Sequence, residues 1–589
     1  MSYSNSFPQQ RPSLNLDFAN SGKLDSRLSY SRSSGGTYMS NEQALNSENL
    51  ISQSADLGSW SEGSSSYTTV TSNATTSPDG TTTAAQLTGL TGTNKKAIYH
   101  PISAGTGSYT SVCFVKPDGH EYVQLMFGGA ATIYQNYHLS GSGTLGNGTN
   151  DAASIDKFGD WYRITLTSNA LSSASNFYVV MVDSNTAARY EDSTSTSSIY
   201  AWGANFSSTN QKVFNSTTTQ IHREYAPLLK TAAADEPRFE YAADGQSVGL
   251  LIEAQSSNLL TYSEDWTNSD FTKFVAITSN AAIAPTGELA ADLVAATSSP
   301  GDHITRQSLT VVSGKTYTLS VFAKASGCNF VRVGGASTAA MPAQASFDLV
   351  NGTIGTVDYG TAKIEDVGNG FYRCSVTGTA ASNTSTHVEI RLMQSDNTPS
   401  WTGDDYSGLL LFGQMAEQSS SVSSYIKSTS SSVSRASDSC SVANFGFTGG
   451  PVSITTEVTA AASADGTQRI FTLFENSDLV STYFSGGGDI KTFVDAGGST
   501  QVDASILADA VSGTDYRIGI SFDTNDYRGV SNGTLGNADT SCTLPAFSSP
   551  TLQIAAQSGG SNPLSGHIKR LSLFSVALSD VELQSLTSS

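Results

Sequence analysis

The chain of 589 residues contains few charged side chains. Asp, Glu, Lys and Arg together make up 14% of it, against about 25% in an average globular protein. Helical proteins rich in Glu and Lys, and disordered proteins kept open by charge, both need more charge than this. The composition excludes both classes and favours β-sheets with neutral surfaces rich in hydroxyl groups.

Positive charge is scarcer still. The 30 Lys and Arg residues are outnumbered by 51 Asp and Glu residues, which gives a net charge of −21. Because nucleic acids and anionic membranes attract basic surfaces, we expect no nucleic-acid partner and no membrane insertion. Apolar runs of about 18 residues, which would predict a membrane span, are also lacking. The first residues do not resemble a signal peptide, so we expect a soluble chain made in a cytoplasm.

Residues that ligate metals or act as nucleophiles are few and scattered. The five Cys form no C-x-x-C motif, and no two of the seven His lie at metal-ligand spacing. We therefore expect neither a disulfide framework nor a zinc site. Ser142 has glycines directly beside it, whereas a nucleophile elbow needs them two residues away on each side. The sequence predicts no catalytic site.

The chain contains an internal repeat with a spacing of about 207–210 residues. Five motifs recur in the same order: Asn49-Leu50-Ile51 with Asn258-Leu259-Leu260, Thr71-Ser72-Asn73 with Thr278-Ser279-Asn280, 109–116 with 317–324, Trp161-Tyr162-Arg163 with Phe371-Tyr372-Arg373, and Trp202-Gly203-Ala204 with Phe412-Gly413-Gln414. Chance would not place five matches in order at nearly one spacing. Residues 49–208 and 258–428 are therefore predicted to be two copies of one domain.

The pattern within each copy is that of β-strands. Residues 317–324 alternate between two faces, and turn signals such as Pro117-Asp118-Gly119 and Asn351-Gly352 separate the strand-like runs. Many short strands with frequent turns predict an antiparallel β-sandwich. Residues 445–589 show the same pattern and are predicted to form a third sandwich.

A short helix is predicted near the end of the third domain. Ser579-Asp580-Val581-Glu582 is a capping box, in which the Ser and Glu side chains satisfy the first backbone N–H groups of a helix. We expect Leu578, Val581, Leu583 and Leu586 to form its buried face. No long amphipathic helix is predicted elsewhere.

Three connecting segments remain, namely residues 1–48, 209–257 and 429–444. The first two contain apolar runs such as Leu16-Asp17-Phe18-Ala19 and Gly249-Leu250-Leu251-Ile252, which flexible spacers lack. We expect these segments to pack as edge strands against neighbouring domains or other chains.

The connectors and the start of the second repeat carry a characteristic set of residues: Leu16-Asp17-Phe18-Ala19, Ser31-Arg32-Ser33, Pro237-Arg238-Phe239, Gly249-Leu250-Leu251-Ile252-Glu253, Asn258-Leu259-Leu260-Thr261-Tyr262-Ser263 and Ser434-Arg435-Ala436. This set resembles a group of bacteriophage virion proteins with carbohydrate-binding-module-like jelly-roll domains, found among tail-fibre and head-decoration components. Asn532-Gly533, 566–571 and 578–582 are similar to late strands and the helix of concanavalin A-like (laminin G-like) sandwiches. The resemblance implies an all-β fold of tandem antiparallel jelly-roll β-sandwiches followed by a C-terminal concanavalin A-like sandwich.

One position departs from this group. Its members end the second connector with an Arg-Thr-Asn-Leu-Leu-like run, where this chain reads Gln255-Ser256-Ser257-Asn258-Leu259-Leu260. The arginine is lost, together with any contact that its charge would make.

The resemblance implies a virion structural protein that works in adhesion and assembly without turnover. A tail fibre or spike that binds host surface glycans is the first hypothesis, and a capsid decoration protein is the alternative within this class. Hydrolysis of a capsule polysaccharide is the alternative of another class. The implied partners are other virion proteins, and because fibres and spikes are commonly trimeric we expect a homotrimer.

Trp401 is the candidate platform for stacking on a sugar. It has no counterpart in the first copy and lies close to Asp404 and Asp405, whose oxygens could complete the hydrogen bonds. Trp161 and Trp202, in contrast, align with Phe371 and Phe412 and are predicted to be core positions.

Calcium is the only cofactor that the sequence suggests. Asp523, Asn525 and Asp526 offer hard oxygen ligands in one turn, of the kind that calcium prefers. A plain turn stabilised by its own Asp and Asn side chains explains the same residues without a metal.

Overall fold

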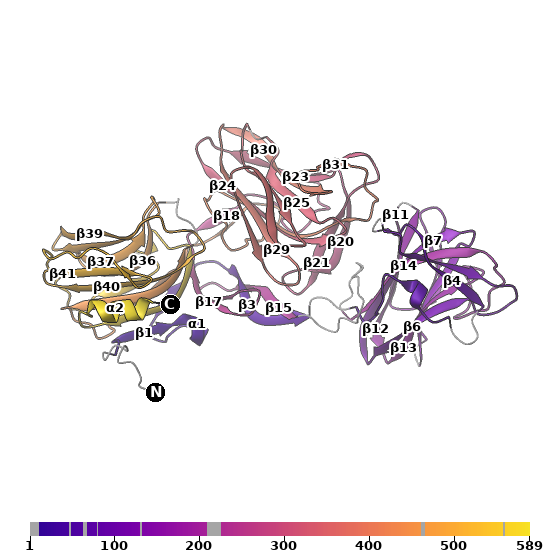
Figure 1. The fold of residues 1–589 in the computed structure, drawn as a ribbon, viewed down its shortest axis with the longest axis horizontal. Coiled ribbons are helices and arrows are strands. Elements are labelled where there is room, and N and C mark those ends of the chain that lie inside the picture. Colours follow the sequence, from indigo (N-terminus) through magenta and orange to yellow (C-terminus); the bar gives the residue numbers. More distant parts are fainter. Residues whose placement is uncertain are drawn as a thin grey trace.

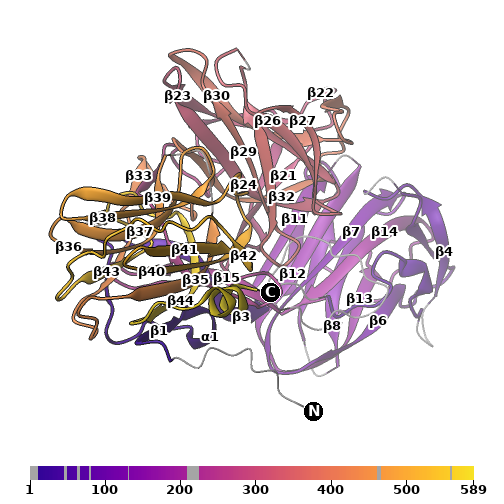
Figure 2. The same ribbon diagram turned by 60° about the vertical axis from the view of Figure 1, so that its left-hand side comes forward.

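The computed structural model describes residues 11–588, except for 46–48, 63–66, 79–80, 130–131, 159, 209–224, 338, 461–465 and 558–559. Strands make up most of the described chain, and Figure 1 shows them gathered into three β-sandwiches. The predicted all-β fold is therefore confirmed. In Figure 1 and in the turned view of Figure 2, the second sandwich lies above and between the other two.

The first sandwich consists of two antiparallel sheets. The six-stranded sheet has the order β11 (Ala152–Phe158), β12 (Trp161–Leu171), β7 (Gly107–Asp118), β14 (Ser198–Ser207), β5 (Ala84–Gly89) and β4 (Thr68–Thr75). The five-stranded sheet has the order β10 (Thr144–Thr149), β9 (Tyr134–His138), β8 (Tyr122–Gly128), β13 (Ala174–Met181) and β6 (Ala97–Ala104). A 3-10 turn, Leu57–Ser59, precedes β4.

The second sandwich has two six-stranded sheets. One has the order β20 (Ala276–Ile283), β21 (Leu289–Ala295), β32 (Gly408–Glu417), β24 (Thr316–Ser326), β29 (Tyr372–Thr379) and β28 (Thr361–Asp366). The other has the order β19 (Phe271–Lys273), β23 (Ile304–Val311), β30 (Thr384–Met393), β25 (Phe330–Gly335), β26 (Gln344–Asp348) and β27 (Thr353–Tyr359). Two short pairs complete it, β22 (Gly301–Asp302) with β31 (Ser400–Trp401) and β18 (Ser256–Asn258) with β33 (Val433–Arg435).

The strand order confirms the predicted repeat. The order β11-β12-β7-β14-β5-β4 of the first sandwich is that of β28-β29-β24-β32-β21-β20 in the second, and β10-β9-β8-β13-β6 is that of β27-β26-β25-β30-β23. The second copy differs by one additional edge strand, β19. Since both copies bury a separate hydrophobic core between their sheets, they are two complete domains of one kind.

A buried asparagine explains the first repeated motif. The Asn49 side-chain amide donates to the backbone oxygen of Ala204 at 3.1 Å, and Asn258 donates in the same way to Gln414 at 3.1 Å. Both asparagines are fully buried. Each one ties the start of its domain to the last long strand, so the motif serves the fold.

The third sandwich also has two antiparallel sheets. One has the order β16 (Arg238–Tyr241), β17 (Ser247–Ile252), β44 (Gly566–Phe574), β35 (Val452–Ala460), β40 (Asp515–Asp523), β41 (Asp526–Ser531) and β42 (Thr534–Leu535), and β1 (Leu14–Asp17) also pairs with β44. The other has the order β2 (Ser29–Ser31), β34 (Ser439–Val442), β43 (Thr551–Ile554), β36 (Gln468–Glu475), β37 (Asp478–Phe484), β38 (Ile490–Ala496) and β39 (Ser499–Leu507).

The third sandwich therefore extends beyond the predicted range 445–589. All three connectors supply strands to it: β1 and β2 from residues 1–48, β16 and β17 from 209–257, and β34 from 429–444. The physical reason is burial, because the side chains of Leu14, Leu16, Phe18, Leu250 and Ile252 are at most 1% exposed and lie in its core. Each such side chain contributes roughly 1.5–3 kcal/mol when it is buried.

The remaining parts of the connectors form a hairpin and a short helix. Strand β3 (Gly36–Leu45) pairs with β15 (Tyr225–Ala232), and α1 (Phe18–Ser21) follows β1 directly. Figure 1 shows this hairpin running below the second sandwich toward the first. The first part of the predicted connector 209–257 lies outside the described residues.

The C-terminal helix α2 (Asp580–Thr587) has the predicted capping box between Ser579 and Glu582. Leu578 and Leu583 are buried as expected, but Val581 is 70% exposed, so its predicted burial is wrong. The buried side of the helix follows Leu583 and Thr587, and Val581 lies about 200° around the helix from Leu583.

One tyrosine joins the first two sandwiches. Tyr406, in the loop before β32, is 7% exposed and packs on the outer face of the first sandwich. Its ring centroid lies 4.7 Å from that of Phe114 and 6.3 Å from that of Trp202. Trp202 and the nearby Trp161 are buried as predicted.

Candidate functional site

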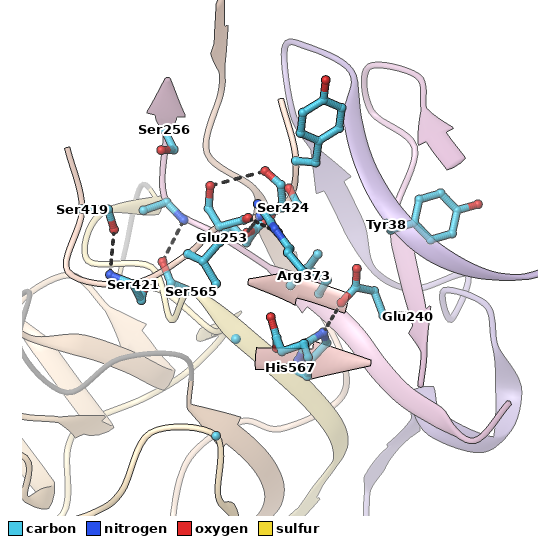
Figure 3. A pocket seen from close by; sticks show the side chains of 18 of the residues that line it. Tyr38, Glu240, Glu253, Ser256, Arg373, Ser419, Ser421, Ser424, Ser565 and His567 are labelled. Atoms are coloured by element: carbon cyan, nitrogen blue, oxygen red, sulfur yellow. Dashed lines mark hydrogen bonds and ion pairs between the residues drawn. The ribbon is translucent and has the colours of Figure 1, made fainter. Parts of the chain in front are cut away.

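A cleft of about 870 Å³ lies where the second sandwich, the third sandwich and the β3–β15 hairpin meet, and we name it the junction cleft. Figure 3 shows Ser419 and Ser421 on one side of it, and Tyr38 and Glu240 on the other. Sites for small molecules measure roughly 300–1,000 Å³. The junction cleft therefore has the size of a ligand site.

A hydrogen-bonded pair of side chains spans two of the walls. The Oε2 atom of Glu240 on β16 lies 2.7 Å from Nε2 of His567 on β44, and the Oε1 atom accepts a hydrogen bond from the Met39 N–H at 3.1 Å. Both ionisable side chains keep some exposure, 17% for His567 and 19% for Glu240. The pair therefore presents both a donor and an acceptor at the cleft.

Two buried carboxylates hold the serine-rich loop that follows β32. Glu417 accepts from the Ser423 N–H at 2.9 Å and from its hydroxyl at 2.7 Å. Glu253 accepts from the Ser424 N–H and hydroxyl, both at 2.7 Å. The loop is fixed on both sides, and Ser419 and Ser421 of the same loop line the cleft.

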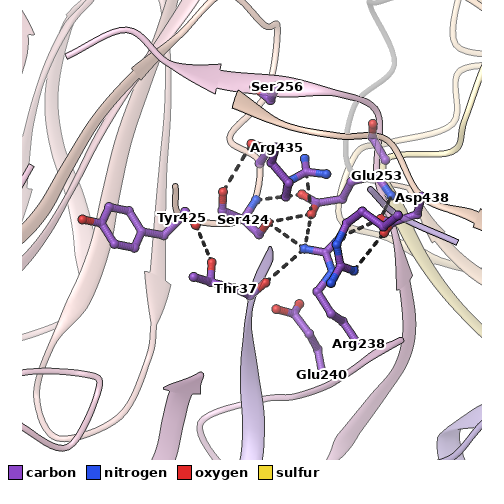
Figure 4. A network of polar contacts seen from close by, with 12 residues as sticks. Thr37, Arg238, Glu240, Glu253, Ser256, Ser424, Tyr425, Arg435 and Asp438 are labelled. Carbon is purple, nitrogen blue, oxygen red and sulfur yellow. Dashed lines mark hydrogen bonds and ion pairs between the residues drawn. The ribbon is translucent and has the colours of Figure 1, made fainter. Parts of the chain in front are cut away.

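Beneath the cleft, the three connectors meet in a network of buried charges (Figure 4), which we name the charge network. It consists of Arg32, Arg238, Arg435, Glu253 and Asp438. Arg238 lies 2.5 Å from Asp438 and 2.7 Å from Glu253, and Arg32 lies 3.1 Å from Asp438. Arg435 lies 3.5 Å from Glu253. The network links one residue or more from every connector.

A glycine allows the three arginines to converge. A Cβ atom at Gly36 would lie 3.2 Å from side-chain atoms of Arg238 and Arg435 and 3.3 Å from Arg32. These distances are too short for an ordinary contact, so a larger residue would push the guanidinium groups apart. The backbone of β3 thus packs directly against the charge network.

The charges change the protonation of their neighbours. Burial alone would raise the pKa of Glu253, but the positive charges of Arg435 and Arg238 and the hydrogen bonds from Ser424 hold it well below its usual range. Burial and the negative charge of Asp438 raise the pKa of Tyr30, whose hydroxyl donates to that carboxylate. Glu253 is therefore ionised and Tyr30 neutral at all physiological pH values.

The sequence-predicted platform Trp401 lies elsewhere, beside a cavity of about 210 Å³ in the second sandwich that Asp404 also lines. Its ring stands edge-on to His303 with centroids 4.5 Å apart, and it packs against the sandwich core. Trp401 is half-buried and lines this cavity, and its role as a glycan platform stays a prediction.

Asp404 and Asp405 shape the loop that carries Tyr406. Asp404 Oδ1 accepts from the backbone N–H groups of Tyr406 at 2.9 Å and of Ser407 at 2.6 Å. Asp405 has a positive φ of 62° and accepts from the Ser298 N–H at 2.9 Å. Asp404 and Trp401 therefore lie close together in the structure. The carboxylates of Asp404 and Asp405 position the loop whose Tyr406 contacts the first sandwich.

The predicted calcium ligands lie in the hairpin between β40 and β41. Asp523 and Asp526 are directly opposite each other in the strand register, so their side chains share one face. Asn525 has a φ of 57° and donates its N–H to the Cys542 oxygen at 2.7 Å. Within the described residues, no group of three or more His, Cys, Asp or Glu side chains could hold a metal. Calcium at this hairpin stays a prediction.

Sequence reasoning missed the junction cleft, because its walls come from segments that lie hundreds of residues apart. A signal for the charge network was present, because Arg32 and Arg238 lie in connectors that also contain apolar runs. Charged residues in such segments are buried only when they are paired. Within the described part of the chain, no helix is long and apolar enough to cross a membrane.

No protein-family model and no curated protein sequence matches the chain. It is similar to the native heptameric SAP-like pentraxin from Limulus polyphemus, with 14% identity over 23% of this chain and 70% of that chain and a TM-score of 0.20. It is also similar to domains LG4-5 of the mouse laminin α1 chain, with 11% identity over 48% and 90% and a TM-score of 0.19. A Trypanosoma rangeli sialidase matches with 8% identity over 95% and 97% and a TM-score of 0.19. TM-scores this low give no information about function. The fold of this chain is therefore described from its own strand pairing.

Proposed function

We propose that this chain is a structural protein of a bacteriophage virion that binds host surface glycans through its β-sandwich modules without turnover. The observation that supports this most is that the connectors are built into the sheets, since β1, β2 and β17 add strands to the third sandwich. Flexible spacers would let the domains move independently. Connectors that are fixed in the third sandwich restrict the movement of the neighbouring domains, as an adhesin on a particle requires.

A tail fibre or spike is the first placement, with other virion proteins and host glycans as partners. A protein that decorates the capsid is the alternative, in which the sandwiches attach to the shell and project from it. In both cases the chain is made in the host cytoplasm and ends in the virion. The low density of charge, with hydroxyl-rich loops, suits repeated weak contacts with polysaccharide.

Hydrolysis of a capsule polysaccharide is the second candidate function. Glycosidases need two carboxylates roughly 5–10 Å apart, one of them with a raised pKa. Glu417 and Glu253 both line or border the junction cleft, and burial raises the pKa of Glu417. Both side chains are at most 4% exposed and their oxygens accept from serines. Because a substrate could not reach them, binding without turnover is the better proposal.

Two further parts of the proposal concern assembly. A homotrimer suits a fibre or spike, and sedimentation of the purified chain measures its mass directly.

Calcium bound by Asp523, Asn525 and Asp526 would relieve the repulsion between the two opposed carboxylates. A calcium-dependent rise in melting temperature that is lost in Asp526→Asn would support that site, and an identical melting curve with and without calcium would remove it.

Cryo-electron microscopy of purified virions, with this chain located in the map, tests the placement. Density along a fibre or at the tail tip, with outward loops, is the expected result. Density over the capsid lattice would favour the decoration protein. A virion without the chain would overturn the proposal.

A further inference from the structure

One half-buried arginine of the third sandwich has no acidic partner. Within the described residues, the side chain of Arg469 on β36 forms one hydrogen bond, from Nη1 to the Ser481 hydroxyl at 2.9 Å, and no ion pair. Its Nε atom has no hydrogen-bond partner there. Burial lowers the pKa of Arg469, whereas at Arg238 the neighbouring Glu253 and Asp438 outweigh burial and raise the pKa. A partly desolvated guanidinium is stabilised when a carboxylate reaches it, and here a ligand could supply that carboxylate.

Arg469 lies in a row with an aromatic ring and a lysine. Tyr483 on β37 is directly opposite Arg469 in the strand register, and Lys491 on β38 is directly opposite Tyr483, so the three side chains share one sheet face. The guanidinium carbon of Arg469 lies 4.4 Å from the centre of the Tyr483 ring. Stacking of this kind fixes the plane of the guanidinium and leaves N–H groups at its edge for a carboxylate. We name these three residues the cationic strip.

The cationic strip lies on the outer face of its sheet. Phe484 and Ile490, which are the chain neighbours of Tyr483 and Lys491, point into the core of the third sandwich, so the strip points the other way. Figure 1 shows β36, β37 and β39 on the side of the third sandwich away from α2. Tyr483 and Lys491 are half-buried, so part of each side chain is accessible to a ligand.

Positive charge is in excess around the strip. The charges that act on the Tyr483 hydroxyl are those of Asp503 and of the two cations of the strip. Asp503 on β39 lies 4.0 Å from the Nζ atom of Lys491 and is 57% exposed, so it holds the lysine weakly. Asp489 and Asp495 lie before and after Lys491 in the chain and form no ion pair with the described residues. Because salt screens charges beyond about 8 Å, the net charge of −21 does not prevent an anion from binding here.

The rest of this sheet face carries hydroxyl, amide and aromatic side chains. The hydroxyls of Thr472 and Ser481 lie 2.9 Å apart, Gln553 is opposite Thr472, and the half-buried Ser441 is opposite Gln553. Phe493, opposite Ser481, is also half-buried. A sugar acid combines a carboxylate with hydroxyl and CH groups, and this face offers a partner for each of them.

We propose that the cationic strip binds a carboxylate of an acidic glycan. The Arg469 guanidinium pairs with the carboxylate, and Lys491 and the Tyr483 hydroxyl complete the contact. The proposal rests on the adhesion function and gives it a site and a class of sugar. It depends neither on Trp401 nor on the junction cleft.

The test uses the full chain on an array of neutral and acidic glycans, followed by calorimetric titration with galacturonic acid oligosaccharides. Their methyl esters are the uncharged form of the same sugar. Arg469→Gln removes the unpaired guanidinium, and Asp503→Asn removes the carboxylate beside Lys491. Arg517→Gln is the matched control, because it changes the net charge equally at a 39% exposed arginine of the other sheet, paired with Glu457. Melting curves check that each variant folds.

We expect Arg469→Gln to bind the free acid about tenfold more weakly, Arg517→Gln to bind like the parent chain, and Asp503→Asn to bind more tightly. Equal binding of the acid and its methyl ester, or equal losses in the two arginine variants, would overturn the site and leave glycan adhesion standing. Binding of neutral glycans alone would do the same. If polyglutamate bound and galacturonate did not, the partner would be an acidic protein and the proposal would fail. If the parent chain bound no glycan, the adhesion function itself would fail.

Discussion

Arg238 and Asp438 are 200 residues apart in the chain, yet their side chains form an ion pair of 2.5 Å with no exposure to solvent. Asp438 also accepts from the Glu253 N–H at 2.8 Å and contacts Arg32 at 3.1 Å. Asp438 therefore joins the three connectors through its contacts with Arg32, Arg238 and Glu253. Burying these charges is costly, and only their mutual pairing offsets that cost.

Asp438→Asn should destabilise the chain strongly, because it leaves two buried guanidinium groups without their carboxylate. We expect a loss of about 3–5 kcal/mol in the free energy of unfolding, measured by denaturant titration. Lys427→Ala is the control: it removes an ion pair to Glu264 in which the lysine is 61% exposed, and should cost less than about 1 kcal/mol. Equal effects of the two substitutions would show that the charge network does not join the connectors.

Asp292 should make the stability of the second sandwich depend on pH. It is 2% exposed, and burial raises its pKa to about 6 despite hydrogen bonds from the Asn280 and Trp266 N–H groups. The folded state therefore binds this proton more tightly than the unfolded state, so the contribution of Asp292 to stability rises as the pH falls from about 6 to about 4.

Asp292→Asn removes this titration. We expect the variant to be more stable than the parent by about 2 kcal/mol at pH 7, and the difference to vanish near pH 4, as followed by melting temperature. Asp244→Asn, at an exposed position, is the control and should follow the parent at every pH. A difference that stayed constant with pH would mean that Asp292 is ionised in both states.

Trp161→Phe should be nearly silent. Trp161 is 7% exposed in the first sandwich, and the equivalent position of the second sandwich holds Phe371, which is fully buried. Swaps between large apolar residues that a core tolerates cost less than about 1.5 kcal/mol. A larger loss in the free energy of unfolding would show that the two sites are packed differently, despite the shared strand order.

Tyr406→Ala should loosen the contact between the first and second sandwiches. The two ring contacts of Tyr406, with Phe114 and Trp202, each contribute about 0.5–1.5 kcal/mol beyond the area that they bury. We expect a larger maximum dimension in small-angle X-ray scattering and no change in strand content by circular dichroism. Tyr359→Ala, at a position 46% exposed in the second sandwich, should leave the scattering curve unchanged. If other contacts held the two sandwiches together, Tyr406→Ala would also leave the scattering curve unchanged.

How far the sequence could predict this structure depends on how locally each feature is encoded. The repeat was predictable, since Asn49 and Asn258 sit in the same motif at a nearly constant spacing. The full extent of the third sandwich was not predictable. Leu14 pairs with Leu573, and a local sequence pattern does not identify a strand partner so far away in the chain. The surroundings of Trp401 were not predictable for a related reason: His303, whose ring stands edge-on to that of Trp401, comes about 100 residues earlier.

Ser256→Arg should add a positive charge beside Glu417, which already interacts with Arg373. Glu417 is fully buried, burial raises its pKa, and its nearest partners are the hydroxyls of Ser256 at 2.6 Å and Ser423 at 2.7 Å. Ser256 lines the junction cleft, so there is room for a longer side chain.

We expect Ser256→Arg to raise the free energy of unfolding by about 1–2 kcal/mol at pH 7, the range of a hydrogen bond to a charged group. The added cation lowers the folded-state pKa of Glu417, so the gain should be present at neutral pH and be lost as the pH falls and the carboxylate becomes protonated. Ser256→Met, of similar length but uncharged, should give no such pH-dependent gain. If both substitutions destabilised the chain equally at pH 7, the hydrogen bonds from Ser256 and Ser423 would already satisfy Glu417, and an added charge would not stabilise the fold.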